Sequence, residues 1–130
     1  MDIVIDTSAL LAVIVGEPER DRIVELTAGH ALVGPGSIVW EVGNAFSAML
    51  KQRRLALAEA QRGLRIFHAI PLRFAKVDLS KAITIAHQTK IYAYDAYFLD
   101  CAVRRAAPLL TLDRGLARAA LKIGVKLLEI

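Results

Sequence analysis

Two hydrophobic patterns alternate along the chain. Short and densely apolar runs predict buried strands at residues 2–6, 31–33, 73–77, 109–112 and 125–129. Between them, apolar residues recur every three or four positions, which predicts helices at residues 8–15, 18–29, 38–52, 57–69, 79–90, 94–106 and 114–123. Strands separated by helices of this length favour a parallel sheet that is covered on both faces. No repeat or linker interrupts the pattern, so we expect a single α/β domain over residues 1–130.

Polar residues at the helix boundaries refine this prediction. Ser37 is positioned to cap the helix over residues 38–52, and Asp78 or Ser80 to cap the helix over residues 79–90. Asp100 precedes Arg104 by four residues, a spacing that predicts an ion pair on one helix face.

Composition narrows the class of protein. Hydrophobic residues make up 55% of the chain, above the roughly 45–50% of an average soluble domain, which suggests an additional apolar interface. The net charge of +4 suits a polyanionic partner and is equally common in proteins that bind no nucleic acid. Cys101 is the only cysteine, which excludes an intrachain disulfide. We see neither a secretory signal nor a membrane span, and therefore expect a cytoplasmic protein without membrane association.

Four acidic residues fall at one edge of the predicted sheet. Asp6 and Asp113 each follow a strand, Glu41 lies about one turn inside its helix, and Asp95 lies in the first turn of its helix. In a parallel sheet the carboxyl ends of the strands meet at one edge, and ligands bind there. Taken singly, Asp6 and Asp113 could be helix N-caps, and Asp95 could favour the positive end of a helix dipole.

Taken together, the four acids predict a cation site. Two carboxylates about 5 Å apart repel by roughly 3 kcal/mol at an effective dielectric constant near 20. Several such pairs require protonation or a bound cation, and oxygen-only ligands suit Mg²⁺ or Mn²⁺. Such an ion can activate water for the hydrolysis of a phosphodiester. The histidines, His30, His68 and His87, lack ligand spacing, so we expect them at the surface or in packing.

Four polar residues could support these acids. Thr7 and Ser8 adjoin Asp6, although helix capping explains them equally well. Asn44 would share a helix face with Glu41 and could orient it. Thr111 stands two residues before Asp113 and could donate a hydrogen bond to a carboxylate or to water.

The order of motifs resembles a known family. DTSAL, an E-x-x-N helix, YDAYFLDCA, LLTLDRGL and a closing GVKLLEI follow one another over nearly the whole chain, as in a PIN domain and more narrowly as in a VapC-type toxin of a toxin–antitoxin pair. The resemblance implies a three-layer α/β/α sandwich around a mainly parallel sheet. It also implies a Mg²⁺- or Mn²⁺-dependent endoribonuclease whose acidic, metal-binding site comprises Asp6, Glu41, Asp95 and Asp113.

The same resemblance implies partners. Members act on RNA, are usually homodimers and are silenced by a cognate antitoxin whose C-terminal segment lies in an apolar groove near the active site. Arg114, beside Asp113, is our candidate for contacting RNA phosphates.

Three alternatives stay open on the residues alone. A phosphoacceptor signalling domain would need a second acidic pair near the N-terminus and a lysine after its last strand. A phosphatase with an aspartyl nucleophile would need an aspartate two residues after Asp6, where Ser8 stands. A PIN-like protein that binds RNA without cleaving it is the closest alternative to a nuclease.

Overall fold

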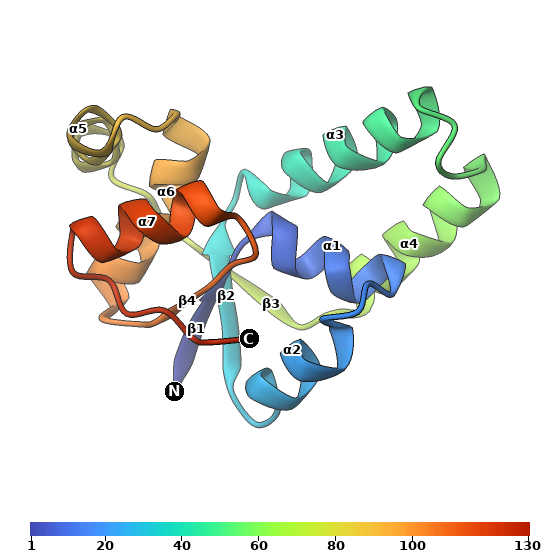
Figure 1. Ribbon diagram of the computed structural model, residues 1–130, viewed down its shortest axis with the longest axis horizontal. Helices are drawn as coiled ribbons and strands as arrows, with labels where there is room; N and C mark the ends of the chain where they lie inside the picture. The colour runs from blue at the N-terminus through green and yellow to red at the C-terminus, as the bar shows by residue number, and fades with distance from the viewer.

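The computed structural model describes residues 1–130, and strands and helices alternate along them (Figure 1). In chain order the elements are β1 (Asp2–Ile5), α1 (Thr7–Val15), α2 (Arg20–Thr27), β2 (Ala31–Pro35), α3 (Ile38–Lys51), α4 (Leu57–Ala69), β3 (Leu72–Ala75), α5 (Leu79–Thr89), α6 (Ala93–Arg105), β4 (Leu109–Leu110) and α7 (Arg114–Lys122). None of the helices combines the length and apolar composition that crossing a lipid bilayer requires.

The four strands form one parallel sheet in the order β3-β2-β1-β4. Residues Ile3 to Ile5 of the central strand β1 are at most 1% exposed, which explains why this strand is apolar without alternation. Figure 1 shows that α1, α3, α6 and α7 all begin near the ends of these strands. Parallel pairing therefore brings the starts of α1, α3 and α7, each of which follows a strand, to one edge of the sheet, and the start of α6 lies at the same edge.

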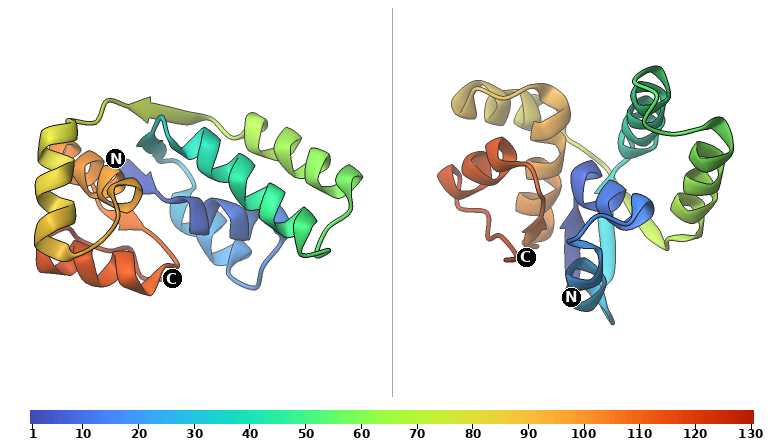
Figure 2. Two further views of the ribbon diagram at one scale, coloured as in Figure 1. Left: turned by 90° about the horizontal axis from the view of Figure 1, so that it is seen from above. Right: turned by 45° about the vertical axis from the view of Figure 1, so that its right-hand side comes forward.

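Helices cover both faces of the sheet, as expected for an α/β/α sandwich. On one face α6 packs against β1, β2 and β4, and α5 packs on α6. On the other face α1 contacts α2, α3 and α4, and Figure 2 shows α3 and α4 running together as a hairpin. One core of 25 buried residues, including Leu10, Phe46 and Phe98, joins the layers.

The strand predicted at residues 125–129 is reduced to a single bridge in the structure. Residues 125–129 contribute one bridge, between Leu127 and Leu109, because β4 itself is only two residues long and offers little ladder to pair with. The tail is nonetheless held at this place, because the amide of Leu109 donates to the Lys126 carbonyl and the amide of Leu128 donates to the Leu109 carbonyl, both at 2.9 Å.

Two predictions about helix boundaries have different outcomes. The Asp78 side chain caps α5, accepting from the Lys81 amide at 3.1 Å, as predicted. Ser37, in contrast, makes no capping hydrogen bond to α3. Its hydroxyl has a better partner in a carboxylate, described below.

Asp100 forms the predicted ion pair with Arg104 and has a closer partner as well. It is 1% exposed and accepts a hydrogen bond from the Asp78 amide at 2.9 Å, whereas the Arg104 guanidinium lies 3.9 Å away. A buried carboxylate requires such bonds, and this one fixes the start of α5 on α6.

Candidate functional site

Asp6 lies between the end of β1 and the start of α1, and it is only 4% exposed. Its carboxylate caps α1 by accepting from the Ala9 amide at 3.0 Å. It also accepts from the Ser8 hydroxyl at 2.7 Å and from the Thr111 hydroxyl at 2.6 Å. Asp6 can therefore cap α1 and belong to a binding site at the same time, because its carboxylate has enough lone pairs for both roles.

Burial raises the pKa of Asp6, because the charged form loses solvation. The hydrogen bonds from Thr111, Ala9 and Ser8 act in the opposite direction, and the Asp113 carboxylate raises the pKa further. The net result is a raised pKa, so Asp6 binds a proton more readily than an exposed aspartate does.

The two hydroxyls near Asp6 join distant parts of the chain. Ser8 accepts from the Leu112 amide at 3.0 Å, and Thr111 accepts from the Asp113 amide at 2.9 Å. The start of α1 is thereby fastened to the connection between β4 and α7. This fixes the position of Asp6 relative to that of Asp113.

Glu41 accepts hydrogen bonds from two hydroxyls, one at the start of α1 and one immediately before α3. Thr7 donates to one carboxylate oxygen at 3.2 Å and Ser37 to the other at 2.9 Å. Burial raises the pKa of Glu41, these two bonds lower it, and the charges of Asp95 and Asp6 raise it again. Asn44, predicted to orient Glu41, is exposed, and the hydrogen bonds observed to Glu41 come from Thr7 and Ser37.

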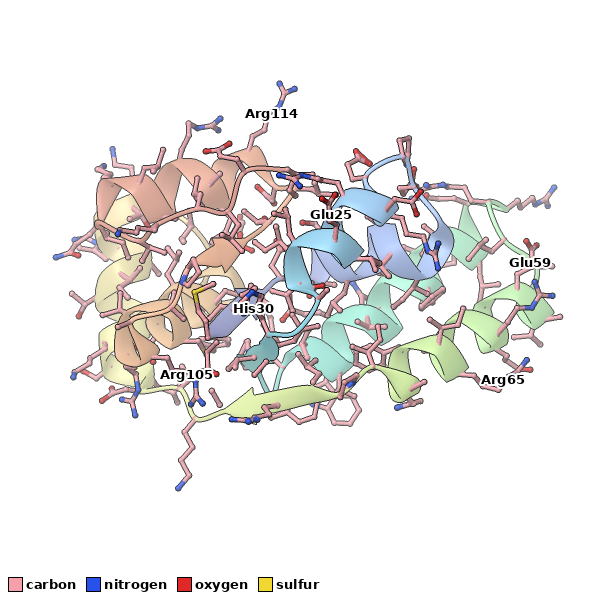
Figure 3. All side chains as sticks on the ribbon, turned by 90° about the horizontal axis from the view of Figure 1, so that it is seen from below. Glu25, His30, Glu59, Arg65, Arg105 and Arg114 are labelled. Carbon is pink, nitrogen blue, oxygen red and sulfur yellow. The ribbon has the colours of Figure 1, made fainter.

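Asp95 and Asp113 complete the set. Asp95 lies in the first turn of α6, and its pKa is raised by burial and by the Asp113 charge. Asp113 is exposed and caps α7 by accepting from the Leu116 amide at 3.0 Å. The adjacent Arg114 extends away from the ribbon into solvent (Figure 3).

Electrostatic coupling joins the four acids in a ring. The coupled neighbours are Asp6 with Asp113, Asp6 with Glu41, Glu41 with Asp95, and Asp95 with Asp113. Residues far apart in the sequence therefore meet at the carboxyl edge of the sheet. Each carboxylate whose pKa is raised would be stabilised by a nearby cation.

The donor set fits a hard divalent cation, with one qualification of geometry. All four acidic side chains offer oxygen ligands, which Mg²⁺ prefers. The three histidines are exposed, as predicted. No three acidic, histidine or cysteine side chains lie close enough together to ligate one ion. Mg²⁺ keeps several waters and commonly binds through one or two carboxylates, so a looser ring of acids suits it.

Ser37 is the supporting residue that the sequence analysis assigned wrongly. Its spacing of four residues before Glu41 puts both side chains on one side of a helical turn, so a bond between them was a readable alternative to capping. Thr111 and Ser8, in contrast, lie where the sequence analysis put them, beside a carboxylate.

Comparisons with known proteins agree with this architecture. The PIN domain family model matches residues 3–122. The structure is similar to that of PAE2754 from Pyrobaculum aerophilum, with 23% identity and a TM-score of 0.72 over 92% of this chain and 87% of that one. No curated protein is significantly similar to the chain in sequence.

Two further solved structures share the fold. VapBC2 from Rickettsia felis, bound to a DNA fragment from its promoter, has 18% identity and a TM-score of 0.66 over 99% of this chain and 98% of that one. VapC20 from Mycobacterium tuberculosis, a toxin that cleaves the sarcin-ricin loop, has 15% identity and a TM-score of 0.63 over 90% and 94%. With a parallel sheet, helices on both faces and a family match over residues 3–122, the chain belongs to the PIN domain family.

Proposed function

We propose that this protein is a metal-dependent endoribonuclease toxin of the VapC type, which hydrolyses RNA phosphodiester bonds and is inhibited by a cognate antitoxin. The observation that carries the proposal is the ring of four coupled carboxylates at the carboxyl edge of the sheet, three of which have raised pKa values. Such a ring is unfavourable for folding without a cation, which supports a role in catalysis.

Asp6, Glu41, Asp95 and Asp113 would hold Mg²⁺ or Mn²⁺, one or two of them directly and the others through the waters of the ion. The bound ion would supply an activated water and charge stabilisation at the phosphate. Hydrogen bonds would keep two of the carboxylates oriented. Thr111 and Ser8 donate to Asp6, and Thr7 and Ser37 donate to Glu41. The Ser8 hydroxyl is already engaged with a carboxylate and a backbone amide, which supports water rather than a serine as the nucleophile.

An apolar groove supports the antitoxin as a partner. It encloses about 430 Å³ between α1 and α3. Leu11, Val15 and Met49 line it, and Ser8 brings one part of it to the position of Asp6. An amphipathic or extended segment of an antitoxin would bury its apolar side chains here. The structural likeness to VapBC2, a toxin–antitoxin pair, supports the same assignment. A homodimer and a cytoplasmic location remain part of the proposal, as the resemblance to VapC-type toxins implies.

A second function deserves a test because one observation favours it. The acids do not form a compact group of three around a single point. A PIN domain with such a site could bind RNA without cleaving it.

The experiment is cleavage of an end-labelled structured RNA by the purified protein in Mg²⁺, in Mn²⁺ and in EDTA. We expect cleavage in either metal, none in EDTA, and a loss of at least about a hundredfold in Asp6→Asn, as for removal of an essential charged group. Asp21→Asn, an exposed acid on α2 with its side chain 97% accessible, is the matched control and retains activity. Equal cleavage by Asp6→Asn and the parent would refute the site, whereas RNA binding without cleavage would establish the second function.

A further inference from the structure

The two edges of the sheet differ in how they are covered. Along β4, the Leu109 amide donates to the Lys126 carbonyl and the Leu128 amide donates to the Leu109 carbonyl, so the tail beyond α7 occupies that edge. β3 forms the other edge and pairs with β2 alone. Apart from a bond of 2.8 Å between the Leu72 amide and the Ile70 carbonyl, β3 makes no backbone hydrogen bond outside that ladder. Its outward N–H and C=O groups can therefore pair with another chain.

The side chains of β3 leave this edge accessible. Phe74 is 54% exposed, and Arg73, which points to the opposite face of the strand, is exposed as well. Figures 2 and 3 show β3 along the border of the molecule, with no helix or strand beyond it. An uncovered edge strand with a large apolar side chain is a template for a further extended chain.

A hollow of about 390 Å³ adjoins the C-terminal end of this edge, between β3 and α6. Its lining residues are Phe74, Ala75, Lys76, Cys101, Arg104 and Arg105. Phe74 and Lys76 are two residues apart, so they point to the same face of the strand, on which the hollow lies. Figure 3 shows Arg105 at this end of β3. Three of the six lining residues are cationic, so the hollow suits an acidic group.

The two arginines of the hollow already have carboxylate partners. Arg105 pairs with Asp2 at 3.1 Å. The Arg104 guanidinium lies 3.9 Å from the carboxylates of Asp78 and Asp100. Because three carboxylates serve these two arginines, the arginines alone would not attract a further anion.

The excess positive charge comes from the edge itself. Arg73 and Lys76 take part in none of the ion pairs of the protein, and they lie on either side of Phe74 along the chain. The same edge of a second copy would bring further cations against these two, and like charges on paired strands are unfavourable. An acidic chain would be attracted instead, so the charges choose between the two occupants.

We propose that the free edge of β3 binds an extended, acidic segment of a partner protein, which adds to the sheet as a further strand. Main-chain hydrogen bonds would provide affinity and alternate side chains would provide specificity. An apolar side chain of the segment would cover Phe74, and acidic ones would meet Lys76 on one face and Arg73 on the other. A polypeptide suits this edge better than RNA does, since another backbone repeats N–H and C=O groups at the spacing of a strand.

This inference goes beyond the proposed function and does not depend on it. The hollow at β3 shares no lining residue with the apolar groove between α1 and α3. An antitoxin segment in that groove and an acidic segment on β3 would therefore occupy different surfaces.

The test uses a fluorescent peptide of about eight residues, within the usual length of a strand, in which glutamate and valine alternate. Fluorescence anisotropy measures its binding to the purified parent protein in EDTA, and hydrogen exchange of the backbone amides locates it. We expect the peptide to slow exchange within residues 72–76. Two control peptides should bind at least about tenfold more weakly: one with lysine in place of glutamate, and one N-methylated at its central residues, which keeps its charge but cannot pair.

Charge reversal on the edge tests the proposed side-chain contacts. Arg73→Glu and Lys76→Glu are each expected to weaken binding of the acidic peptide by about 2- to 30-fold, because an attraction between exposed charges becomes a repulsion. Arg65→Glu is the matched control, since Arg65 is exposed on α4, forms no ion pair and changes the net charge equally. This variant should bind the peptide nearly as well as the parent.

Three results would overturn the inference. The first is unchanged exchange within β3 at saturating peptide, or equal binding of the N-methylated peptide. The second is slowed exchange within β3 with oligouridylate of the same length and not with the peptide, which would make the edge a nucleic-acid surface. The third is a parent dimer, seen by sedimentation, whose β3 amides are already protected, which would make the occupant a second copy. RNA cleavage with metal is measured separately, so either proposal can fail while the other stands.

Discussion

At the scale of single residues, the site depends on hydroxyls that hold carboxylates against the cost of burial. Asp6 is 4% exposed, and the shortest of its hydrogen bonds comes from Thr111 at 2.6 Å. That bond favours the charged form, whereas burial and the Asp113 charge favour the protonated form. Thr111 is therefore the residue through which the pKa of Asp6 is most directly adjustable.

We predict that Thr111→Val raises the pKa of Asp6 further, because the substitution removes a hydrogen bond that favours the charged carboxylate. The measurement is a pH titration of the Asp6 carboxyl carbon by NMR in metal-free buffer. Thr111→Ser keeps the hydroxyl and should titrate like the parent. An unchanged pKa in Thr111→Val would mean that the short bond has no influence on the ionisation of Asp6.

At the scale of elements, the α3–α4 hairpin positions Glu41 and depends on a glycine. Gly63 lies within α4 facing α3, and a Cβ atom there would come 2.5 Å from Phe46 Cζ and 3.2 Å from Ile14 Cγ2. A helical glycine is unfavourable by about 1 kcal/mol relative to alanine, so helix propensity alone does not explain this residue. The close approach of the two helices does.

We predict that Gly63→Ala lowers the free energy of unfolding by about 1–3 kcal/mol, the usual cost of overpacking, despite the better helix propensity of alanine. Gly43→Ala on α3 is the control: no atom lies within 4 Å of its Cβ position, so it should stabilise the protein by about 0.5–1 kcal/mol. Denaturant unfolding measures both. Stabilisation by Gly63→Ala would show that α4 can move away from Phe46 without cost.

At the scale of the whole molecule, folding and cation binding are linked through the acids. Asp6, Glu41 and Asp95 have raised pKa values in the folded protein, against ordinary values of 3.8, 4.5 and 3.8. Between the ordinary and the raised values the folded state binds more protons than the unfolded state. The stability that these groups contribute is therefore complete below the ordinary values and is lost as pH rises through the raised ones.

We predict that Mg²⁺ restores this stability at neutral pH, by about 2.7 kcal/mol when its concentration is a hundred times the Kd. Thermal unfolding in EDTA and in Mg²⁺ across the acidic range measures the effect. Asp95→Asn should melt at a higher temperature than the parent in EDTA, by up to about 4 °C, and respond less to Mg²⁺ and to pH. If the melting temperature of the parent protein does not change with Mg²⁺, the protein does not bind the cation at this site.

The sequence by itself determined the alternation of strands and helices, the parallel sheet and the four acids at its edge. These features are local or follow from rules of connection, since hydrophobic period sets each element and parallel pairing brings the strand ends together. The motif order also led to the PIN family, which the family model confirms. Asp6 and Asp113 proved to be helix caps and ring members at once, so the two readings of these acids did not compete.

Only the tertiary structure decided which side chains meet. Thr7 reaches Glu41 across 34 positions of sequence, and Thr111 reaches Asp6 across 105. The tail beyond α7 forms a single bridge where the apolar pattern predicted a strand, because β4 is too short to pair with more. Sequence spacing fixes neighbours along an element, whereas partners from different elements are chosen by how the helices pack on the sheet, and the ring of carboxylates is of this second kind.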